Sequence, residues 1–311
     1  MTVDASTLLI DGPWRHQLVP ANGARFHVAI AGPDDNDAPL VVLLHGMPEF
    51  WWAWRHQLPV LAAAGYRVAA MDLRGTGASD KPPHGYDVPT LARDVAGLVR
   101  SLGADRAVVV GAGTGGEIAW AMPAIAPDVT SAIAVLGSPH PLQARAEPLG
   151  SLRLRAARHL AYFQLPSLPE RAMASSDLVV RLLREWGARG WTTPEIEDMY
   201  RQAARVPFAA HSAMERARWL VRSVPRVDGQ RYLGALRAAP AVPVLQLHGG
   251  EDGCRPAATA AASGRLLTRL GAGYRFELIP DAGHFLAEEA PDRVNALLLS
   301  WLREVAPTVS P

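Results

Sequence analysis

Short hydrophobic runs of strand length recur along the chain and alternate with segments of helical length. The runs cover residues 41–45, 67–72, 107–111, 132–137, 242–248 and 275–280. Most are apolar at both odd and even positions, which is typical of strands buried on both faces of a parallel sheet. Segments such as 88–102 and 116–126 have the length and hydrophobic period of helices. The alternation predicts an α/β fold with helices on both faces of the sheet.

Two regions depart from this alternation. Residues 15–31 predict a β-hairpin, because two strand-like runs flank Asn22-Gly23, a dipeptide that accepts the positive φ angles of a tight turn. Between about 142 and 228 the strand pattern stops, and the segment is helical in character and interrupted by prolines. We expect a helical cap at 142–228, inserted between an N-terminal core part at 1–141 and a C-terminal core part at 229–311.

The cap interval is basic, with 14 Arg against 9 Asp and Glu. A basic cap is consistent with attraction of an acidic substrate. The alternative, solvated arginines opposite an acidic core, is the interpretation that composition alone favours.

Overall composition narrows the class of protein. The chain has 311 residues, 49% of them hydrophobic, and a net charge of +1, which excludes a disordered chain and the charge pattern of a general nucleic-acid binder. No run of 18 apolar residues predicts a membrane span, and the first 11 residues lack the basic region of a signal peptide. Cys254 is the single cysteine, which excludes disulfides within the chain. The excess of Arg over Lys, with abundant Ala and Pro, suggests a GC-rich genome. We expect a cytoplasmic bacterial protein and leave a homodimer open.

Several motifs follow the predicted strands. They are His45-Gly46-Met47-Pro48-Glu49 with Trp52 and Trp54-Arg55, Asp72-Leu73-Arg74-Gly75 with Gly77 and Ser79-Asp80, Pro139-His140-Pro141, Phe163-Gln164-Leu165-Pro166, His248-Gly249 with Asp252 and Pro256, and Gly283-His284-Phe285. In this order and spacing they resemble the α/β-hydrolase fold, and specifically its epoxide-hydrolase-like branch, across residues 12–305. The resemblance implies a mostly parallel central sheet, an inserted helical cap, a small-molecule substrate, and neither a metal nor an organic cofactor.

The resemblance places the nucleophile position of the family at Gly113. The turn Gly111-Ala112-Gly113-Thr114-Gly115 matches the G-x-nucleophile-x-G elbow, where epoxide hydrolases carry Asp and esterases carry Ser. Glycine has no side chain, so the covalent ester intermediate of the family cannot form there. Either the nucleophile was lost from a dead enzyme or a binding protein, or a different reaction uses the space. An engineered knockout is a third interpretation.

Other residues at the strand ends favour a surviving catalytic site. His284 stands where the family keeps its base, and Asp252 where the family's acid orients that base. The backbone N–H groups of Met47 and Thr114 stand at the positions of the oxyanion hole. The alternative is that His284 and Asp252 persist only as a hydrogen bond that braces two loops.

Three further departures from the family concern the cap and the elbow helix. Local alignment puts His159 and His211 at the positions of the two cap tyrosines that hold the epoxide oxygen in epoxide hydrolases. Glu117 lies one helical turn beyond Gly113, so its side chain could reach the vacated nucleophile space, close to His284. The alternative for Glu117 is a buried carboxylate paired with a nearby Arg or His. We also expect Glu49 and Trp52, from the first motif, to contact the substrate.

The hypothesis from sequence is therefore an epoxide-hydrolase-like enzyme that uses general acid–base chemistry. His284, oriented by Asp252, would deprotonate water and so hydrolyse an epoxide or an ester without a covalent intermediate. A lyase, a cyclase and a cofactor-free oxygenase on the same fold remain alternatives, as does a non-catalytic binder of small molecules.

Overall fold

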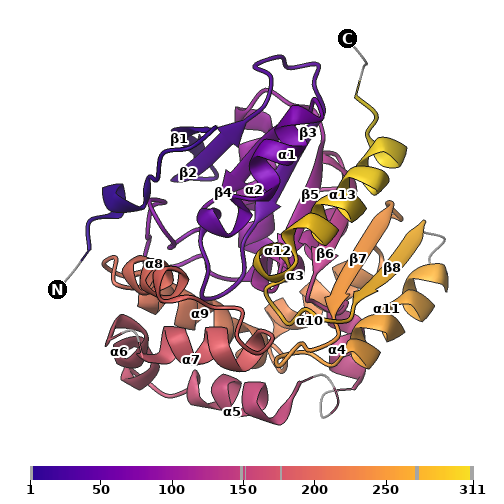
Figure 1. Cartoon of the computed structure of the whole chain (residues 1–311). Helices are drawn as coiled ribbons and strands as arrows, with labels where there is room; N and C mark the ends of the chain where they lie inside the picture. Colours follow the sequence, from indigo (N-terminus) through magenta and orange to yellow (C-terminus); the bar gives the residue numbers. More distant parts are fainter. Residues whose placement is uncertain (1–2, 148–149, 151, 176, 270–272, 309–311) are drawn as a thin grey trace.

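The computed structural model describes residues 3–147, 150, 152–175, 177–269 and 273–308, which form one eight-stranded sheet with helices around it (Figure 1). The strand order is β1-β2-β4-β3-β5-β6-β7-β8. The hairpin β1–β2 and the pair β2–β4 are antiparallel, and every other neighbouring pair is parallel. The strands are β1 (Arg15–Ala21), β2 (Ala24–Ala31), β3 (Leu40–Leu44), β4 (Arg67–Met71), β5 (Ala107–Ala112), β6 (Thr130–Leu136), β7 (Val244–Gly249) and β8 (Tyr274–Ile279).

The predicted α/β-hydrolase architecture is confirmed, because each of the six predicted strand runs forms a strand whose ends differ by at most two residues. The strand predicted from residue 242 begins at Val244, directly after Pro243, which has no N–H group to donate to a neighbouring strand. The hairpin turn is also as predicted, with φ of 44° at Asn22 and 76° at Gly23.

Alternation of side chains along the central strands divides the hydrophobic core into two layers. Val41 and Leu43 of β3 pack on one face with residues of α1 and α13, whereas Val42 and Leu44 pack on the other with residues of α2 and α3. The helices of the core are η1 (Ala5–Leu8), η2 (Trp51–Trp54), α1 (Gln57–Ala63), α2 (Val88–Ser101), α3 (Thr114–Ile125), α4 (Pro141–Ala146), α10 (Val227–Arg237), α11 (Ala257–Arg269), α12 (Leu286–Glu289) and α13 (Pro291–Val305).

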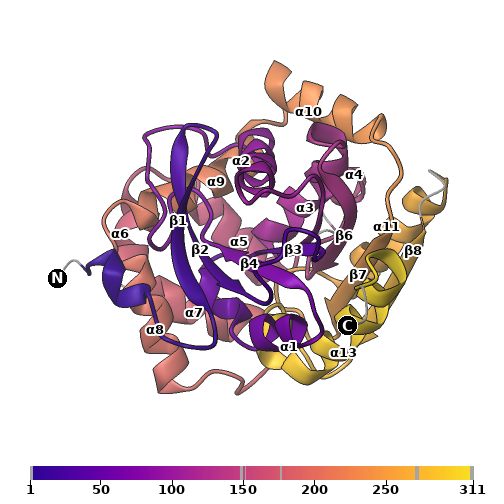
Figure 2. The ribbon, with the colours of Figure 1, turned by 90° about the horizontal axis from the view of Figure 1, so that it is seen from above.

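Five further helices gather at one end of the molecule (Figure 1). They are α5 (Leu154–Tyr162), α6 (Leu168–Ser175), α7 (Asp177–Trp186), α8 (Pro194–Ala204) and α9 (Ala209–Arg222), all within the interval predicted to form the cap. The helices that flank them pack on the core, α4 against α11 and α10 against α3, as the view from above shows (Figure 2). The cap helices thus face the loops that follow the parallel strands.

The described part of the chain has no helix with the length and hydropathy that crossing a membrane requires.

Candidate active site

The turn between β5 and α3 carries Gly113 at its crest. Gly113 has φ 49° and ψ −112°, a backbone conformation that residues with a side chain rarely adopt. A Cβ atom built on Gly113 would lie 3.2 Å from Nε2 of His284 and 3.5 Å from Cα of Gly46. The turn therefore brings the loops after β5, β3 and β8 to one point at the carboxyl edge of the sheet.

His284 and Asp252 meet at this edge from two loops. The Nδ1–H group of His284 donates to Oδ2 of Asp252 at 2.9 Å, so Nε2 is the ring nitrogen that faces Gly113. The second oxygen of Asp252 accepts the backbone N–H groups of Cys254 and Arg255, both at 2.7 Å. These bonds fix the carboxylate, and through it the orientation and the tautomer of the imidazole.

The electrostatics of this pair favour its charged forms. Burial raises the pKa of Asp252, but the His284 charge and hydrogen bond outweigh burial and hold it below its ordinary value. Burial lowers the pKa of His284, and the Asp252 carboxylate overcomes this and raises it above its ordinary value of 6.5. The pair is thus a buried imidazole whose proton affinity is increased by a carboxylate, as a general base requires.

The end of the cap helix α7 holds both loops of the pair. The carbonyl oxygen of Trp186 accepts the backbone N–H of Gly253 at 2.9 Å and that of His284 at 3.1 Å. The indole of Trp186 also packs edge-on against the His284 ring, with centroids 5.6 Å apart. One cap residue therefore contacts the base directly and both loops of the pair through its carbonyl.

Two backbone N–H groups beside Gly113 lack acceptors among the described residues, those of Met47 and Thr114. Thr114 opens α3, so its N–H belongs to the unpaired first turn of that helix. Met47 lies in the loop after β3, and both residues line the same cavity as His284. The pair can stabilise negative charge that develops on an oxygen atom.

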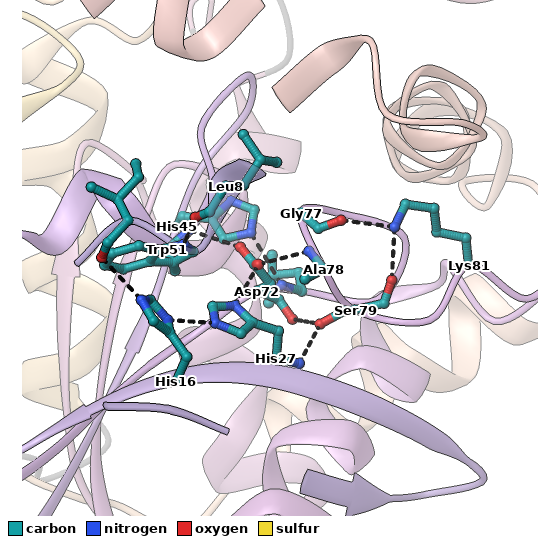
Figure 3. A network of polar contacts seen from close by, with 12 residues as sticks. Leu8, His16, His27, His45, Trp51, Asp72, Gly77, Ala78, Ser79 and Lys81 are labelled. Atoms are coloured by element: carbon teal, nitrogen blue, oxygen red, sulfur yellow. Dashed lines mark hydrogen bonds and ion pairs between the residues drawn. The ribbon is translucent and has the colours of Figure 1, made fainter. Parts of the chain in front are cut away.

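A buried polar network holds the loop that carries Met47 (Figure 3). Asp72 accepts the backbone N–H of Trp51 at 2.9 Å and that of Ala78 at 3.1 Å, and Nδ1–H of His27 donates to it at 2.7 Å. Nε2 of His45 accepts the N–H of Leu73 at 3.1 Å. These bonds tie the loop after β3 to the loop after β4. They explain why the sequence places Asp and His at the ends of these strands.

A cavity of about 500 Å³ lies above the turn. Most of its lining is apolar, and its charged side chains are three arginines and one glutamate besides His284. The lining residues are Met47, Gly113, Thr114, Glu117, Gly137, Ser138, Pro141, Ala144, Arg145, Leu152, Ala156, Leu160, Phe163, Trp186, Ala213, Arg216, Ala217, Trp219, Leu220, Val221, Val224, Tyr232, Leu233, Cys254, Arg255 and His284.

Glu117 lines this cavity, but its bond is to an arginine and not to His284. Its Oε1 accepts from Nη2 of Arg255 at 3.1 Å. Burial raises the pKa of Glu117, and Arg255 acts in the opposite direction. Within the described residues no hydrogen bond joins the Glu117 carboxylate to His284. The ion pair is the alternative that the sequence left open for Glu117, a buried carboxylate paired with an arginine, and it stands in place of a direct bond to the base.

The structure corrects the placement of both cap histidines. His211 is exposed and lies beside Tyr86, because α9 turns residues Ala213 and Ala217 toward the cavity and positions two residues apart point to nearly opposite sides of a helix. His159 is buried behind the lining residues, where its Nδ1 accepts from Nε1 of Trp186 at 3.2 Å. Neither histidine lines the cavity.

Neither Glu49 nor Trp52 lines the cavity, although Glu49 lies close enough to His284 for their charges to interact. Oε2 of Glu49 accepts the N–H of Gly46 at 2.9 Å, and burial, with the nearby Glu288 carboxylate, raises the pKa of Glu49 to about 8. The face of Trp52 is covered by the guanidinium of Arg55, 3.5 Å from the ring centroid. The expectation that these two side chains contact the substrate is corrected accordingly.

Sequence reasoning missed Arg145, Trp219 and Tyr232, which come to the cavity from α4, α9 and α10. No motif marks them, because their convergence depends on how the cap helix α9 packs beside the core helices α4 and α10. No group of three or more His, Cys, Asp or Glu residues in the described ranges is placed to bind a metal ion.

Comparison with known proteins gives a consistent set of relatives. A family model described as alpha/beta hydrolase fold matches residues 39–291. The chain is 32% identical over 295 residues to the AB hydrolase superfamily protein YfhM of Bacillus subtilis, covering 92% of this chain and 97% of that protein. It is 31% identical over 322 residues to epoxide hydrolase A of Mycobacterium tuberculosis, and the match covers 92% of this chain and 96% of that protein. The crystal structure of epoxide hydrolase A from Mycobacterium thermoresistibile superposes with a TM-score of 0.75 at 27% sequence identity. The superposition covers 93% of this chain and 98% of that one.

Proposed function

The chain belongs to the α/β-hydrolase fold family, and on this premise we propose that it is an epoxide-hydrolase-like enzyme that hydrolyses its substrate without a covalent intermediate. One observation carries the proposal. The point where a side chain at residue 113 would begin lies 3.2 Å from Nε2 of His284, which is hydrogen-bond distance. Because glycine leaves the space beyond this point open, a water molecule there is within reach of the base, in the place where relatives of this fold carry a nucleophile.

The remaining groups complete a general-base mechanism. Nε2 of His284 accepts a proton from water while the water oxygen bonds to the carbonyl carbon of an ester. The N–H groups of Met47 and Thr114 hold the resulting oxyanion. When the tetrahedral intermediate collapses, the bond to the leaving oxygen breaks and His284 returns the proton to it. The products are a carboxylic acid and an alcohol, and Asp252 balances the charge of the imidazolium.

An ester suits this site better than an epoxide. Opening an epoxide leaves an alkoxide, which is a strong base and calls for an acid on the far side of the oxygen. Among the described cap residues that line the cavity, none is Tyr, His, Asp or Glu. Epoxide hydrolysis remains the second candidate, because the relatives named above include epoxide hydrolases. The same base would also serve elimination, cyclisation or cofactor-free oxygenation.

Isotope labelling in a single turnover tests the proposal. Excess enzyme in H₂¹⁸O should transfer ¹⁸O to the product in the first turnover, because the attacking oxygen comes from solvent. A covalent route through a carboxylate would instead leave the first product unlabelled and place ¹⁸O in the protein. A covalent route through a hydroxyl such as that of Thr114 would also label the product, and mass spectrometry of the quenched reaction would identify it by an acylated protein. The panel of candidate substrates for this experiment consists of aryl and alkyl esters and of terminal and internal epoxides.

Two variants identify the base. His284→Ala should reduce kcat/KM roughly 10²- to 10⁴-fold, the usual contribution of general acid–base catalysis. His84→Ala, which removes an exposed imidazole outside the cavity, should leave the rate unchanged. Full turnover by His284→Ala contradicts the mechanism, and binding of panel compounds without turnover supports a non-catalytic binder.

A further inference from the structure

One wall of the cavity contains polar atoms that have no partner. Oη of Tyr232, Nε1 of Trp219, Nη1 of Arg145 and Oε2 of Glu117 are buried, and within the described structure none of them makes a hydrogen bond. All four residues line the cavity. Tyr232 is 4% exposed and Trp219 is 9% exposed. Buried polar groups are almost always paired, so the three unpaired donors, of Tyr232, Trp219 and Arg145, indicate a site that a ligand completes, whereas Oε2 of Glu117 is an acceptor that such a ligand does not satisfy.

These residues form one cluster although they come from different helices. The rings of Trp219 and Tyr232 pack edge-on with centroids 5.4 Å apart. Nη2 of Arg145 donates to the hydroxyl of Ser223 at 3.2 Å, one helical turn beyond Trp219. Figure 2 shows α3, α4 and α10, which carry Glu117, Arg145 and Tyr232, on the same side of the molecule.

The chemistry of the cluster selects an acceptor with negative charge. Arg145 and Trp219 can only donate hydrogen bonds, and the hydroxyl of Tyr232 can donate as well. The Glu117 carboxylate already has Arg255 as its ion-pair partner at 3.1 Å, whereas Arg145 makes no ion pair with a carboxylate among the described residues. One positive charge in this wall is therefore left for a ligand to neutralise.

We propose that this cluster, Arg145 with Trp219 and Tyr232, is a binding subsite for a carboxylate at the distal end of the substrate. It rests on the proposed function in one respect: the other end of the same molecule carries the ester that His284 attacks. The apolar lining between the two ends accommodates a hydrocarbon body, so the substrate class is the half-ester of a dicarboxylic acid or a related acid ester. The excess of Arg over acidic residues in the cap then has a role in attracting such an anion.

Binding alone tests the subsite, without any turnover. The probes are 4-phenylbutanoate and its neutral amide 4-phenylbutanamide, measured by isothermal titration calorimetry at pH 7. We expect the carboxylate to bind at least tenfold more tightly than the amide. Arg145→Gln should abolish this preference and leave the affinity for the amide within twofold. Arg158→Gln, which removes an exposed cap arginine that does not line the cavity, should preserve the preference.

A second, milder variant tests the subsite in case Arg145→Gln does not fold. Tyr232→Phe removes only a hydroxyl and should weaken carboxylate binding roughly threefold to tenfold, with an unchanged melting temperature as evidence of a folded protein. Equal affinity for the two probes in the wild type, no binding of either, or equal effects of Arg145→Gln and Arg158→Gln would each overturn the subsite. Because these are binding measurements, failure of the hydrolytic mechanism leaves them intact. Ester hydrolysis that shows no preference for a distal carboxylate would overturn the subsite while sparing the mechanism.

Discussion

Glu49 gives the sharpest prediction about stability, because it is a buried carboxyl group whose pKa differs widely between the folded and unfolded states. Burial, and next the neighbouring Glu288, raise its pKa from an ordinary value of 4.5 to about 8. The unfolded chain loses this proton near pH 4.5, whereas the folded protein keeps it up to about pH 8. Between these values the folded state binds more protons, so the Glu49 contribution to stability falls as pH rises.

The perturbation is Glu49→Gln, which does not titrate and keeps an oxygen to accept the N–H of Gly46. One pKa unit corresponds to about 1.4 kcal/mol, so the interval from 4.5 to about 8 predicts about 5 kcal/mol at high pH. Below pH 4.5 both proteins carry a neutral side chain and their stabilities should be similar. At pH 9 the variant should be the more stable of the two by about that amount.

Urea denaturation of both proteins at pH 5, 7 and 9 measures the effect, and the difference between them cancels the other titrating groups. A difference that grows steadily from pH 5 to pH 9 supports the buried neutral carboxyl. A constant difference across this range would refute the reasoning, because it would mean that Glu49 is ionised in the folded protein.

Two other predictions concern the turn and the base. Gly113→Ala should lower the free energy of unfolding by about 1–3 kcal/mol, from the positive φ and the contact with His284. Gly23→Ala, at a positive φ with nothing within 4 Å, is the matched control in denaturant titrations and should lower the free energy of unfolding by less. Equal losses of stability in the two variants would show that the contact with the His284 ring costs nothing. Asp252→Asn should lower the pKa of His284, because it removes the charge and the hydrogen bond that chiefly oppose burial, and should move the acid limb of the pH–rate profile to lower pH. An acid limb that does not move in the variant would contradict the assignment of His284 as the base. In the wild type, the contribution of this imidazole to stability is complete below pH 6.5 and is lost as pH rises through its raised pKa. NMR titration of the ring can follow that pKa.

The strands could be predicted from the hydrophobic pattern, and the pairing of His284 with Asp252 from the resemblance to the α/β-hydrolase family. Parallel strands buried on both faces are continuous apolar runs, and their carboxyl ends meet at one edge of the sheet. The direction in which His211 points could not be predicted. It depends on the rotation of α9, which is set by packing against the core and not by local spacing. The partner of Glu117 could be expected only as an Arg or a His and not identified, because Arg255 stands 138 positions away in the chain.

The Trp186 carbonyl accepts hydrogen bonds from the backbone N–H groups of both Gly253 and His284. The end of α7 and the two loops should therefore unfold locally as one cooperative unit. Glycine is required at both flanking contacts, because a Cβ on Gly253 would lie 2.0 Å from the Glu185 carbonyl oxygen and one on Gly283 would lie 2.2 Å from the Ala188 nitrogen. The cap therefore cannot lift at this corner while the base stays in place. Access to the cavity is expected elsewhere along the rim, and hydrogen exchange of the Gly253 and His284 amides should give one common free energy of opening, that of α7 release.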